Sequence, residues 1–209
     1  MSFPAPAWDK ALFECVNRIV RHPILDVAMP VLSSAAFLWV LGAVVFAWTL
    51  RGNIKRNLIG VLILAAAVGA SDLGTNVIKK KIARVRPLNA LQGTHFIEDG
   101  EWRTRPETFT PTKEKGTSLP SAHAANAMAA AFIAFLLWPG TRKLIFLLPL
   151  LVGYSRVYLG KHYPLDVLTG WVFGMAAAGL VYALGIRLCA RFGVSLKARI
   201  DAESSNSPR

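Results

Sequence analysis

The feature that most constrains the fold is a series of long apolar runs separated by short polar or basic segments. A helix needs roughly 17 to 25 mainly apolar residues to cross the ~30 Å hydrocarbon core of a bilayer. Runs of about this length occur at Val31–Leu50, Leu58–Ile78, Ala122–Trp138, Leu144–Leu159 and Leu165–Leu188. The sequence therefore predicts an all-α integral membrane bundle of about five transmembrane helices, forming a single domain over residues 1–209.

Composition supports a membrane protein and argues against nucleic acid as a partner. Hydrophobic residues make up 54% of the chain and charged residues 17%, and the mean hydropathy is +0.42. This is too apolar for the surface of a soluble domain. The formal net charge is +12, but Lys and Arg stand in short clusters between the apolar runs instead of forming one patch. We therefore expect this positive charge to interact with membrane lipid or phosphate, and not with nucleic acid.

The residues before the first apolar run, 1–24, show a different pattern. Apolar side chains recur at helical spacing and polar side chains take the opposite face; the apolar set is Trp8, Leu12, Val16, Ile19 and Val20. This pattern favours a helix lying in the membrane interface, and it also fits an extension of the first span. The segment lacks a short apolar core followed by a small-residue cleavage site, so we expect no cleaved signal peptide.

The segments between the apolar runs differ in length. The connections at Arg51–Asn57 and Pro139–Lys143 are short, residues 88–119 form a long loop, and residues 197–209 form a polar tail. Five crossings would place the end of the second run, the start of the third, the end of the fourth and the start of the fifth on one side of the membrane. The unusual polar residues of the sequence stand at these four points.

Basic residues mark two of these points. The second run ends in a cluster followed by Pro87: Lys79, Lys80, Lys81, Arg84 and Arg86. Such a cluster is often only a flank whose side chains reach the headgroups. Arg156 is a stronger signal because it lies inside the fourth run, where an unpaired guanidinium costs at least about 2.5 kcal/mol. It therefore indicates a buried partner or a functional site.

The other two points carry histidines. His162 and Asp166 are four residues apart, and Pro164 suits the first turn of a helix. The carboxylate could then hold one imidazole nitrogen and leave the other free to react. The third run opens with Pro-Ser-Ala-His over residues 120–123. A helix N-terminus there would offer backbone amides and the positive end of the helix dipole to an anion such as phosphate.

Together these residues resemble the type 2 phosphatidic acid phosphatase family. Its signature has three parts: Lys, six residues, Arg-Pro; then Pro-Ser-Gly-His; then Ser-Arg, five residues, His, three residues, Asp. The chain matches these parts at Lys79, Arg86, Pro87, Pro120, Ser121, His123, Ser155, Arg156, His162 and Asp166. It departs at Ala122, where the family usually has glycine. Three spaced motifs in the right order are far more specific than any one of them alone.

The resemblance implies a membrane lipid phosphatase and gives a role to each motif residue. His162 would be the nucleophile that forms a phosphohistidine, and Asp166 would orient it and stabilise its charge. His123 would protonate the leaving oxygen and then activate water. The phosphate would be bound by Lys79, Arg86, Arg156, Ser121 and the amide of Ala122. Because these cations can supply the charge that displacement at phosphorus needs, the resemblance implies no metal and no other cofactor.

Two further polar residues are possible supports of this site. Asp72 shares a face of the second run with Lys79. It could orient Lys79 or Arg156, and it could equally belong to a structural polar network. Ser155 precedes Arg156 in the third motif.

The remaining candidates are expected to have no catalytic role. His95 is expected to be a solvated histidine of the long loop, in which Phe96, Trp102 and Phe109 could form a lid, dip into the interface or pack against the bundle. Cys15 and Cys189 lie near opposite ends of the chain. We expect them to be structural residues on opposite faces of the membrane that form no disulfide.

The resemblance implies a substrate with an apolar tail and a terminal phosphate, such as undecaprenyl diphosphate, phosphatidylglycerol phosphate, phosphatidic acid or a lipid A phosphate. Small bacterial chains of this layout often recycle the cell-wall carrier, which favours undecaprenyl diphosphate, but the residues themselves do not choose. A transporter or anion-binding membrane protein could use the same cations and would bind phosphate without turnover. Related haloperoxidases are typically soluble, which disfavours their chemistry here.

The expected location is a bacterial-type inner (plasma) membrane. Basic residues in the short loops and the tail favour a cytoplasmic side opposite the motifs. The long loop and the active site would then be extracytoplasmic, where phosphate binding would account for their positive charge. The sequence does not determine the oligomeric state.

Overall fold

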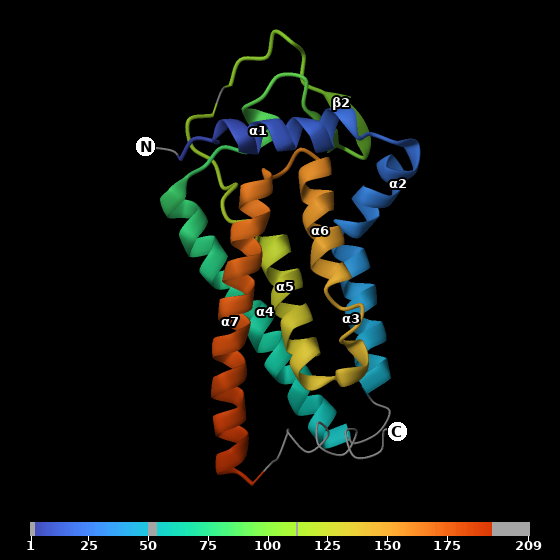
Figure 1. Ribbon diagram of the computed structural model, residues 1–209, viewed down its shortest axis with the longest axis vertical. Coiled ribbons are helices and arrows are strands. Elements are labelled where there is room, and N and C mark those ends of the chain that lie inside the picture. The colour runs from blue at the N-terminus through green and yellow to red at the C-terminus, as the bar shows by residue number, and fades with distance from the viewer. Residues whose placement is uncertain (1–2, 50–53, 112, 194–209) are drawn as a thin grey trace.

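A computed structural model describes residues 3–49, 54–111 and 113–193 of the chain (Figure 1). Helices occur at all five predicted apolar runs, so the mostly helical fold is confirmed. The predicted polar tail, 197–209, lies outside the described residues, as do Leu50 at the end of the first predicted run and residues 51–53 of the predicted short loop.

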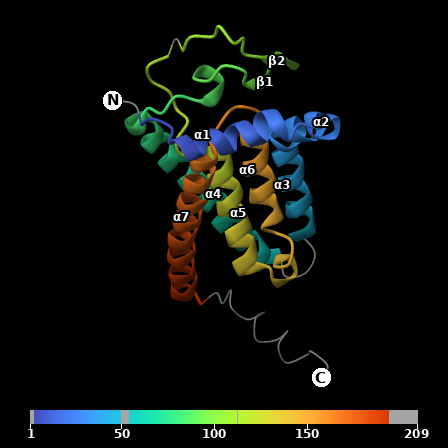
Figure 2. The ribbon, with the colours of Figure 1, turned by 45° about the horizontal axis from the view of Figure 1, so that its top comes forward.

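The N-terminal segment forms a helix that runs across one end of the bundle (Figures 1 and 2). It consists of α1 (Ala7–Glu14) and a π-helical turn (Cys15–Ile19). The prediction of one helix over 1–24 is too long, because α2 (Pro23–Leu32) starts a new helix at a proline. Trp8 and Leu12 of α1 are half exposed, whereas Asp9 is fully buried. This helix therefore turns its polar face toward the protein.

The other helices form the bundle: α3 (Ala35–Thr49), α4 (Ile54–Ile82), α5 (Ala122–Leu137), α6 (Leu147–Tyr158) and α7 (Pro164–Arg191). Short 3-10 turns at Pro87–Asn89 and Pro139–Thr141 follow α4 and α5. α5 contacts α4, α6 and α7 and so lies at the centre of the fold. The chain runs up α4 and α6 and down α5 and α7, which brings the four predicted polar ends to the end of the bundle that α1 covers (Figure 1).

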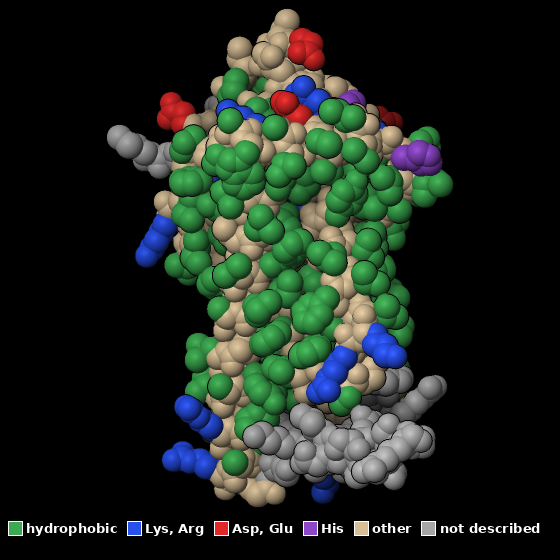
Figure 3. Space-filling model, in the orientation of Figure 1, with side chains coloured by type: hydrophobic (Ala, Val, Ile, Leu, Met, Phe, Trp, Pro, Cys, Tyr) green, Lys and Arg blue, Asp and Glu red, His purple; other side chains and the backbone are tan. Residues whose placement is uncertain are grey.

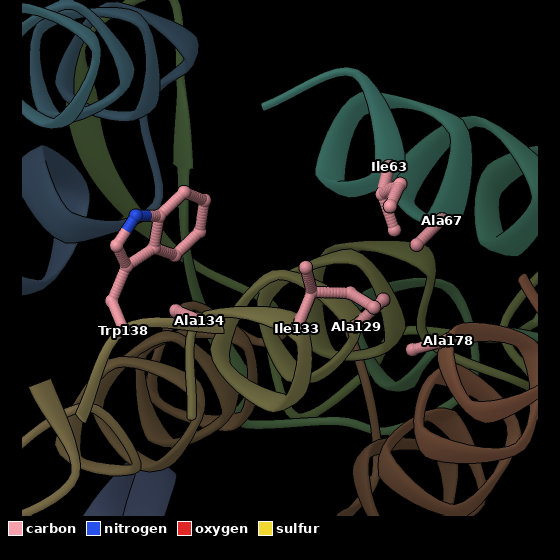
Figure 4. Packing of buried hydrophobic residues seen from close by; sticks show 7 residues of the cluster. All are labelled: Ile63, Ala67, Ala129, Ile133, Ala134, Trp138 and Ala178. Atoms are coloured by element: carbon pink, nitrogen blue, oxygen red, sulfur yellow. The ribbon is translucent and has the colours of Figure 1, made fainter. Parts of the chain in front are cut away.

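Small side chains let α5 approach its neighbours closely. One core cluster joins α4, α5 and α7 (Figure 4): Ile63, Ala67, Ala129, Ile133, Ala134, Trp138 and Ala178. Nearer the covered end, a Cβ atom added to Gly174 of α7 would lie 2.1 Å from the carbonyl oxygen of Ala125 in α5. Glycine is therefore required there for the two backbones to touch, and this contact fixes the start of α5 against the start of α7.

The long loop contains an antiparallel hairpin that the all-α prediction missed. It pairs β1 (His95–Glu98) with β2 (Glu101–Thr104), and Asp99 and Gly100 in its turn both have positive φ. An Asp-Gly pair is a typical sequence signal for such a tight turn. Phe96 is buried, and Trp102 lies edge-on to Tyr158 of α6 with ring centroids 6.0 Å apart. Of the alternatives for these two aromatic residues, the structure therefore favours packing.

On the face shown in Figure 3, the middle of the molecule is covered mainly by hydrophobic side chains, and charged side chains gather toward its two ends. By length and composition, two helices among the described residues could cross a membrane: α4 with the turn after it, and α7. The predicted count of five spans is not confirmed, because α3, α5 and α6 have only 15, 16 and 12 residues. α6 is shorter than its apolar run because residues 139–146 form turns.

Candidate active site

The three motifs meet at the end of the bundle that α1 covers. Lys79 lies in the last turn of α4, His123 in the first turn of α5, and Arg156 in the last turn of α6. His162 lies in the connection between α6 and α7, and Asp166 in the first turn of α7. The charges of Lys79, Arg86 and Arg156 act on one another, and those of Lys79 and Arg156 act on His123. The fold thus brings together residues that are up to 87 positions apart, from Lys79 to Asp166.

Lys161 adds a further cation that the motif analysis did not single out. Its charge acts on His123 and is in turn affected by Arg156 and Arg86. Its position next to His162 in the sequence was the available signal.

The predicted phosphate-binding residues have unused hydrogen-bonding atoms in the described part of the chain. Ser121 is the N-cap of α5, but its buried Oγ has no hydrogen-bond partner, and neither do the buried Nε atoms of Arg86 and Arg156. Buried polar groups of this kind are rare in proteins and often belong to functional sites. One further nitrogen of Arg156 donates to Ser33 Oγ, at the end of α2. Arg156 is therefore held in place while its Nε remains available.

Ala122 fits its position without backbone strain. It is the first residue of α5. Among the described residues, only Ala83 and Asp99 combine a side chain with a positive φ. The glycine that the family usually has at this position is therefore not needed here for a left-handed backbone.

His162 is held in one tautomer. Its side chain is only 1% exposed, and its Nδ1 lies 2.8 Å from the backbone carbonyl oxygen of Ser118. A carbonyl can only accept, so Nδ1 carries the proton. Asp166 Oδ2 lies 3.6 Å from Nδ1, which is too long for a hydrogen bond but close enough for a strong charge interaction. The carboxylate therefore acts on His162 through its charge, and the carbonyl of Ser118 makes the contact that the sequence analysis assigned to Asp166.

The environment keeps His162 uncharged. Burial, together with the charges of Arg156 and Arg86, lowers the pKa of His162 to about 4, although Asp166 opposes this shift. At pH 7 the imidazole is therefore neutral, with the proton on Nδ1 and the lone pair on Nε2.

Asp166 is fully buried and is held by four donors. As the third residue of α7, it accepts a hydrogen bond at Oδ2 from the amide of Tyr163, 2.8 Å away, which is the carboxylate half of a capping box. The hydroxyl of Ser118 donates to the same oxygen, at 2.5 Å. Arg84 Nη1 donates to Oδ1, at 2.6 Å. The backbone amide of Ser121 also donates to the carbonyl oxygen of Asp166, at 2.8 Å. Asp166 of the third motif is therefore hydrogen-bonded directly to Ser121 of the second motif.

Two residues of this network, Arg84 and Ser118, were not predicted as part of the site. The chain turns sharply after α4 at Ala83, where φ is +53°, and the amides of Gly116 and Ser118 then bond to the carbonyl oxygens of Ala83 and Arg84. This pairing places both side chains beside Asp166. Arg84 stood in the predicted basic cluster, but nothing in the sequence around Ser118 marks it as a partner of Asp166.

The other candidates lie outside this network. Asp72 accepts hydrogen bonds from Asn76 and Asn126, at 3.1 and 3.0 Å, and so links α4 to α5, although its charge also acts on Lys79. Ser155 donates to the carbonyl oxygen of Val152 within its own helix. His95 pairs with Thr104 across the hairpin.

Neither a disulfide nor a metal cluster is present in the part of the chain that the structure describes. Cys15 and Cys189 are both free thiols. No three His, Cys, Asp or Glu side chains of residues 3–49, 54–111 and 113–193 are grouped so that they could hold a metal ion.

Comparisons with known proteins identify a family and several relatives. The sequence model of the PAP2 superfamily matches residues 60–188. An undecaprenyl-diphosphatase from Sulfolobus acidocaldarius is 33% identical over 121 residues, which cover 57% of this chain and 52% of that protein. Phosphatidylglycerophosphatase B from Escherichia coli K12 is 30% identical over 171 residues, which cover 69% of this chain and 67% of that protein. The chain thus spans about half of the length of the first relative and about two thirds of the length of the second.

Two solved structures are similar as well. The crystal structure of Aquifex aeolicus LpxE has the same fold, with a TM-score of 0.66 at 24% identity, covering 88% of this chain and 99% of that one. That of a transmembrane PAP2 type phosphatidylglycerolphosphate phosphatase from Bacillus subtilis gives a TM-score of 0.58 at 26% identity, covering 87% of this chain and 86% of that one. The family match covers more than half of the chain and includes all three motifs. The chain therefore belongs to the PAP2 superfamily.

Proposed function

We propose that this protein is a membrane lipid phosphatase that removes a terminal phosphate through a phosphohistidine at His162. The observation that carries the proposal is the state of this residue: a neutral imidazole with its proton fixed on Nδ1 by the carbonyl of Ser118. Its Nε2 lone pair is then free to attack. The charges of Arg86 and Arg156 act on the same imidazole.

In the first step, Nε2 of His162 attacks phosphorus and the bond from phosphorus to the leaving oxygen breaks. His123, in its protonated form, gives that oxygen a proton and becomes neutral. In the second step, His123 takes a proton from water, the water oxygen attacks phosphorus, the P–N bond breaks and inorganic phosphate leaves. Lys79, Arg86 and Arg156 stabilise the charge on the three remaining phosphate oxygens, with Ser121 and the first amides of α5. Asp166 stabilises the positive charge that His162 gains in the covalent intermediate.

The favoured substrate is undecaprenyl diphosphate. The similarity to the Sulfolobus acidocaldarius undecaprenyl-diphosphatase supports this choice. The similarity to phosphatidylglycerophosphatase B and to a lipid A 1-phosphatase from Rhizobium etli keeps phosphatidylglycerol phosphate, phosphatidic acid and lipid A phosphates as alternatives. A transporter or anion-binding protein would not need the fixed tautomer of His162, which disfavours that alternative.

Phosphate release from a panel of lipid phosphates tests the proposed function. We expect the purified protein to release inorganic phosphate from at least one of them, with undecaprenyl diphosphate the best, and to do so equally well in EDTA because arginine and lysine side chains supply the positive charge. Binding of the lipids without any release would favour a transporter or binding protein. Loss of activity in EDTA that Mg²⁺ or Zn²⁺ restores would overturn the metal-independent mechanism.

We place the active site on the extracytoplasmic face of a bacterial-type inner membrane. Single cysteines introduced by Lys115→Cys in the long loop and Lys143→Cys between α5 and α6 test this in a Cys15→Ser, Cys189→Ser background. Both lysines are exposed and lie in connections at opposite ends of α5. A membrane-impermeant thiol reagent added to intact cells should label the first variant and label the second only after lysis. The reverse pattern would place catalysis in the cytoplasm.

A further inference from the structure

We propose that Asp9 of α1 is a positioning residue for the reaction and that α1 is therefore part of the active site. Asp9 would act through Arg84 on Asp166, and through Asp166 on the nucleophile. This inference rests on the proposed function for the role of His162. It adds an element from outside residues 60–188, the part of the chain that the family model matches.

The contacts form a continuous chain from α1 to the imidazole. Arg84 divides its two terminal nitrogens between two carboxylates: Nη2 donates to Asp9 Oδ2 at 2.5 Å, and Nη1 donates to Asp166 Oδ1 at 2.6 Å. The second oxygen of Asp9 accepts from the amide of Leu165, at 2.8 Å. Asp9 therefore holds Arg84 and also the first turn of α7, which carries Asp166.

This chain is shielded from solvent. The side chains of Asp9 and Asp166 are fully buried, and that of Arg84 is 1% exposed. The guanidinium carbon of Arg84 lies 4.4 Å from the centre of the Tyr163 ring, and Phe13 of α1 packs on the same ring at 5.6 Å. Charge interactions are strong where water is excluded. A charge at Asp9 therefore acts on Arg84 and Asp166 with little screening.

The geometry explains why Asp9 matters for the reaction as well as for packing. A guanidinium can bind one carboxylate with two parallel hydrogen bonds. Asp9 occupies one of the two terminal nitrogens of Arg84 and so leaves only the other terminal nitrogen for Asp166. Without that competition, Arg84 would take both oxygens of Asp166 and draw Oδ2 away from Ser118, whose carbonyl fixes the tautomer of His162. The loss of Asp9 would also leave Arg84 with one carboxylate partner where it now has two.

The sequence pattern of α1 is consistent with this role. Trp8 and Leu12 point outward and are half exposed, which suits contact with lipid, while Asp9 between them points inward. The carboxylate that aligns the site is thus carried by a helix expected to lie in the membrane interface.

The test compares Asp9→Asn and Asp9→Glu with a matched control, Glu14→Gln. Glu14 is on the same helix and pairs only with Arg18, at 3.8 Å, among the described residues. Asp9→Asn should lower kcat by about 10- to 100-fold, the loss expected from a small misplacement of reacting groups. KM should change little because no phosphate contact is lost. Asp9→Glu should recover much of the loss, and Glu14→Gln should match the wild type. Wild-type kcat in Asp9→Asn, or an equal loss in Glu14→Gln, would overturn the proposal.

A double-mutant cycle separates positioning from folding. Arg84→Lys keeps the charge but replaces the two terminal nitrogens of the planar guanidinium by a single ammonium nitrogen on a flexible stem. It should therefore lose activity by a similar factor, and adding Asp9→Asn to it should lower kcat little further. If kcat of the double variant is lowered by the product of the two single-variant factors, the route through Arg84 is refuted. If Asp9→Asn does not fold, Arg84→Lys alone tests the route, because it should lower kcat by about 10- to 100-fold while Asp9→Glu stays near the wild type. Wild-type kcat in Arg84→Lys would then refute the route.

A spectroscopic measurement decides the point without turnover. The ¹⁵N shifts of the His162 ring should show a single Nδ1-protonated tautomer in the wild type and in Glu14→Gln, and a tautomer mixture in Asp9→Asn. An unchanged single tautomer in Asp9→Asn would contradict the proposal. A wild type that has this tautomer but hydrolyses no lipid phosphate would refute the proposed function and leave the effect of Asp9 on His162 measurable.

Discussion

Replacing His162 by alanine is expected to abolish turnover of every phosphate ester and anhydride that the protein accepts. The loss should be on the order of 10⁴-fold or more, because no leaving group can substitute for a missing nucleophile. Steady-state phosphate release from a lipid monophosphate, a lipid diphosphate and an aryl phosphate measures it. His95→Ala is the matched control because His95 pairs with Thr104 in the hairpin and not with the site. Substantial activity of His162→Ala on any of these substrates would show that another group attacks phosphorus.

Replacing His123 by alanine should produce a loss that depends on the leaving group. A general acid typically contributes about 10²- to 10⁴-fold, and its contribution is largest when the departing oxygen is a basic lipid alkoxide. We therefore expect a loss near the top of this range for a lipid monophosphate and a much smaller loss for a lipid diphosphate or an aryl phosphate. Single-turnover rates of the first step are the appropriate measurement, because His123 also activates water in the second step.

The two histidine variants thus differ in pattern as well as in size. An equal loss of the first-step rate for good and poor leaving groups in His123→Ala would remove the role of general acid. The surroundings of the two residues also differ: His162 is buried with its Nδ1 bonded to a carbonyl, whereas His123 is only partly buried at the start of α5.

The sequence predicted that the motif residues lie at one end of the bundle. Apolar runs of membrane length alternate in direction, so polar residues at the end of one run and the start of the next must lie on one side. This argument placed Lys79, His123, Arg156 and His162 together, and the structure has them at one end of the bundle. Their catalytic roles remain predictions, because positions alone do not show chemistry.

The contacts that hold these residues could not be predicted in the same way. Three hydrogen bonds join residues that are far apart in the sequence. Arg156 bonds to Ser33 across 123 residues, Asp166 to Ser118 across 48, and Arg84 to Asp9 across 75. Serine and aspartate at such positions have no local pattern that distinguishes a site contact from an exposed polar residue. Only the way α1, the end of α2 and the long loop close over the bundle brings them to the motifs.

The lengths of the helices were predicted less well for a related reason. Apolar residues continue through the turns after α5, so the run Leu144–Leu159 appeared longer than α6, which begins at Leu147. Hydropathy does not distinguish an apolar turn from an apolar helix. The hairpin was not predicted, although Asp99–Gly100 is a typical sequence signal for its turn. Its two strands have only four residues each, which is too short for a clear alternating pattern.

The most direct test of the account is to trap the phosphorylated protein during turnover. A lipid phosphate labelled with ³²P in its terminal phosphate is mixed with the wild type, His123→Ala and His162→Ala, and the reaction is quenched in alkali, in which phosphohistidine survives. We predict label on the protein that is stable in alkali and lost in acid, located at His162 by mass spectrometry and longer-lived in His123→Ala because water activation is slowed. Label on another residue, label that persists in His162→Ala, or phosphate release at full rate with no protein-bound label would contradict the account.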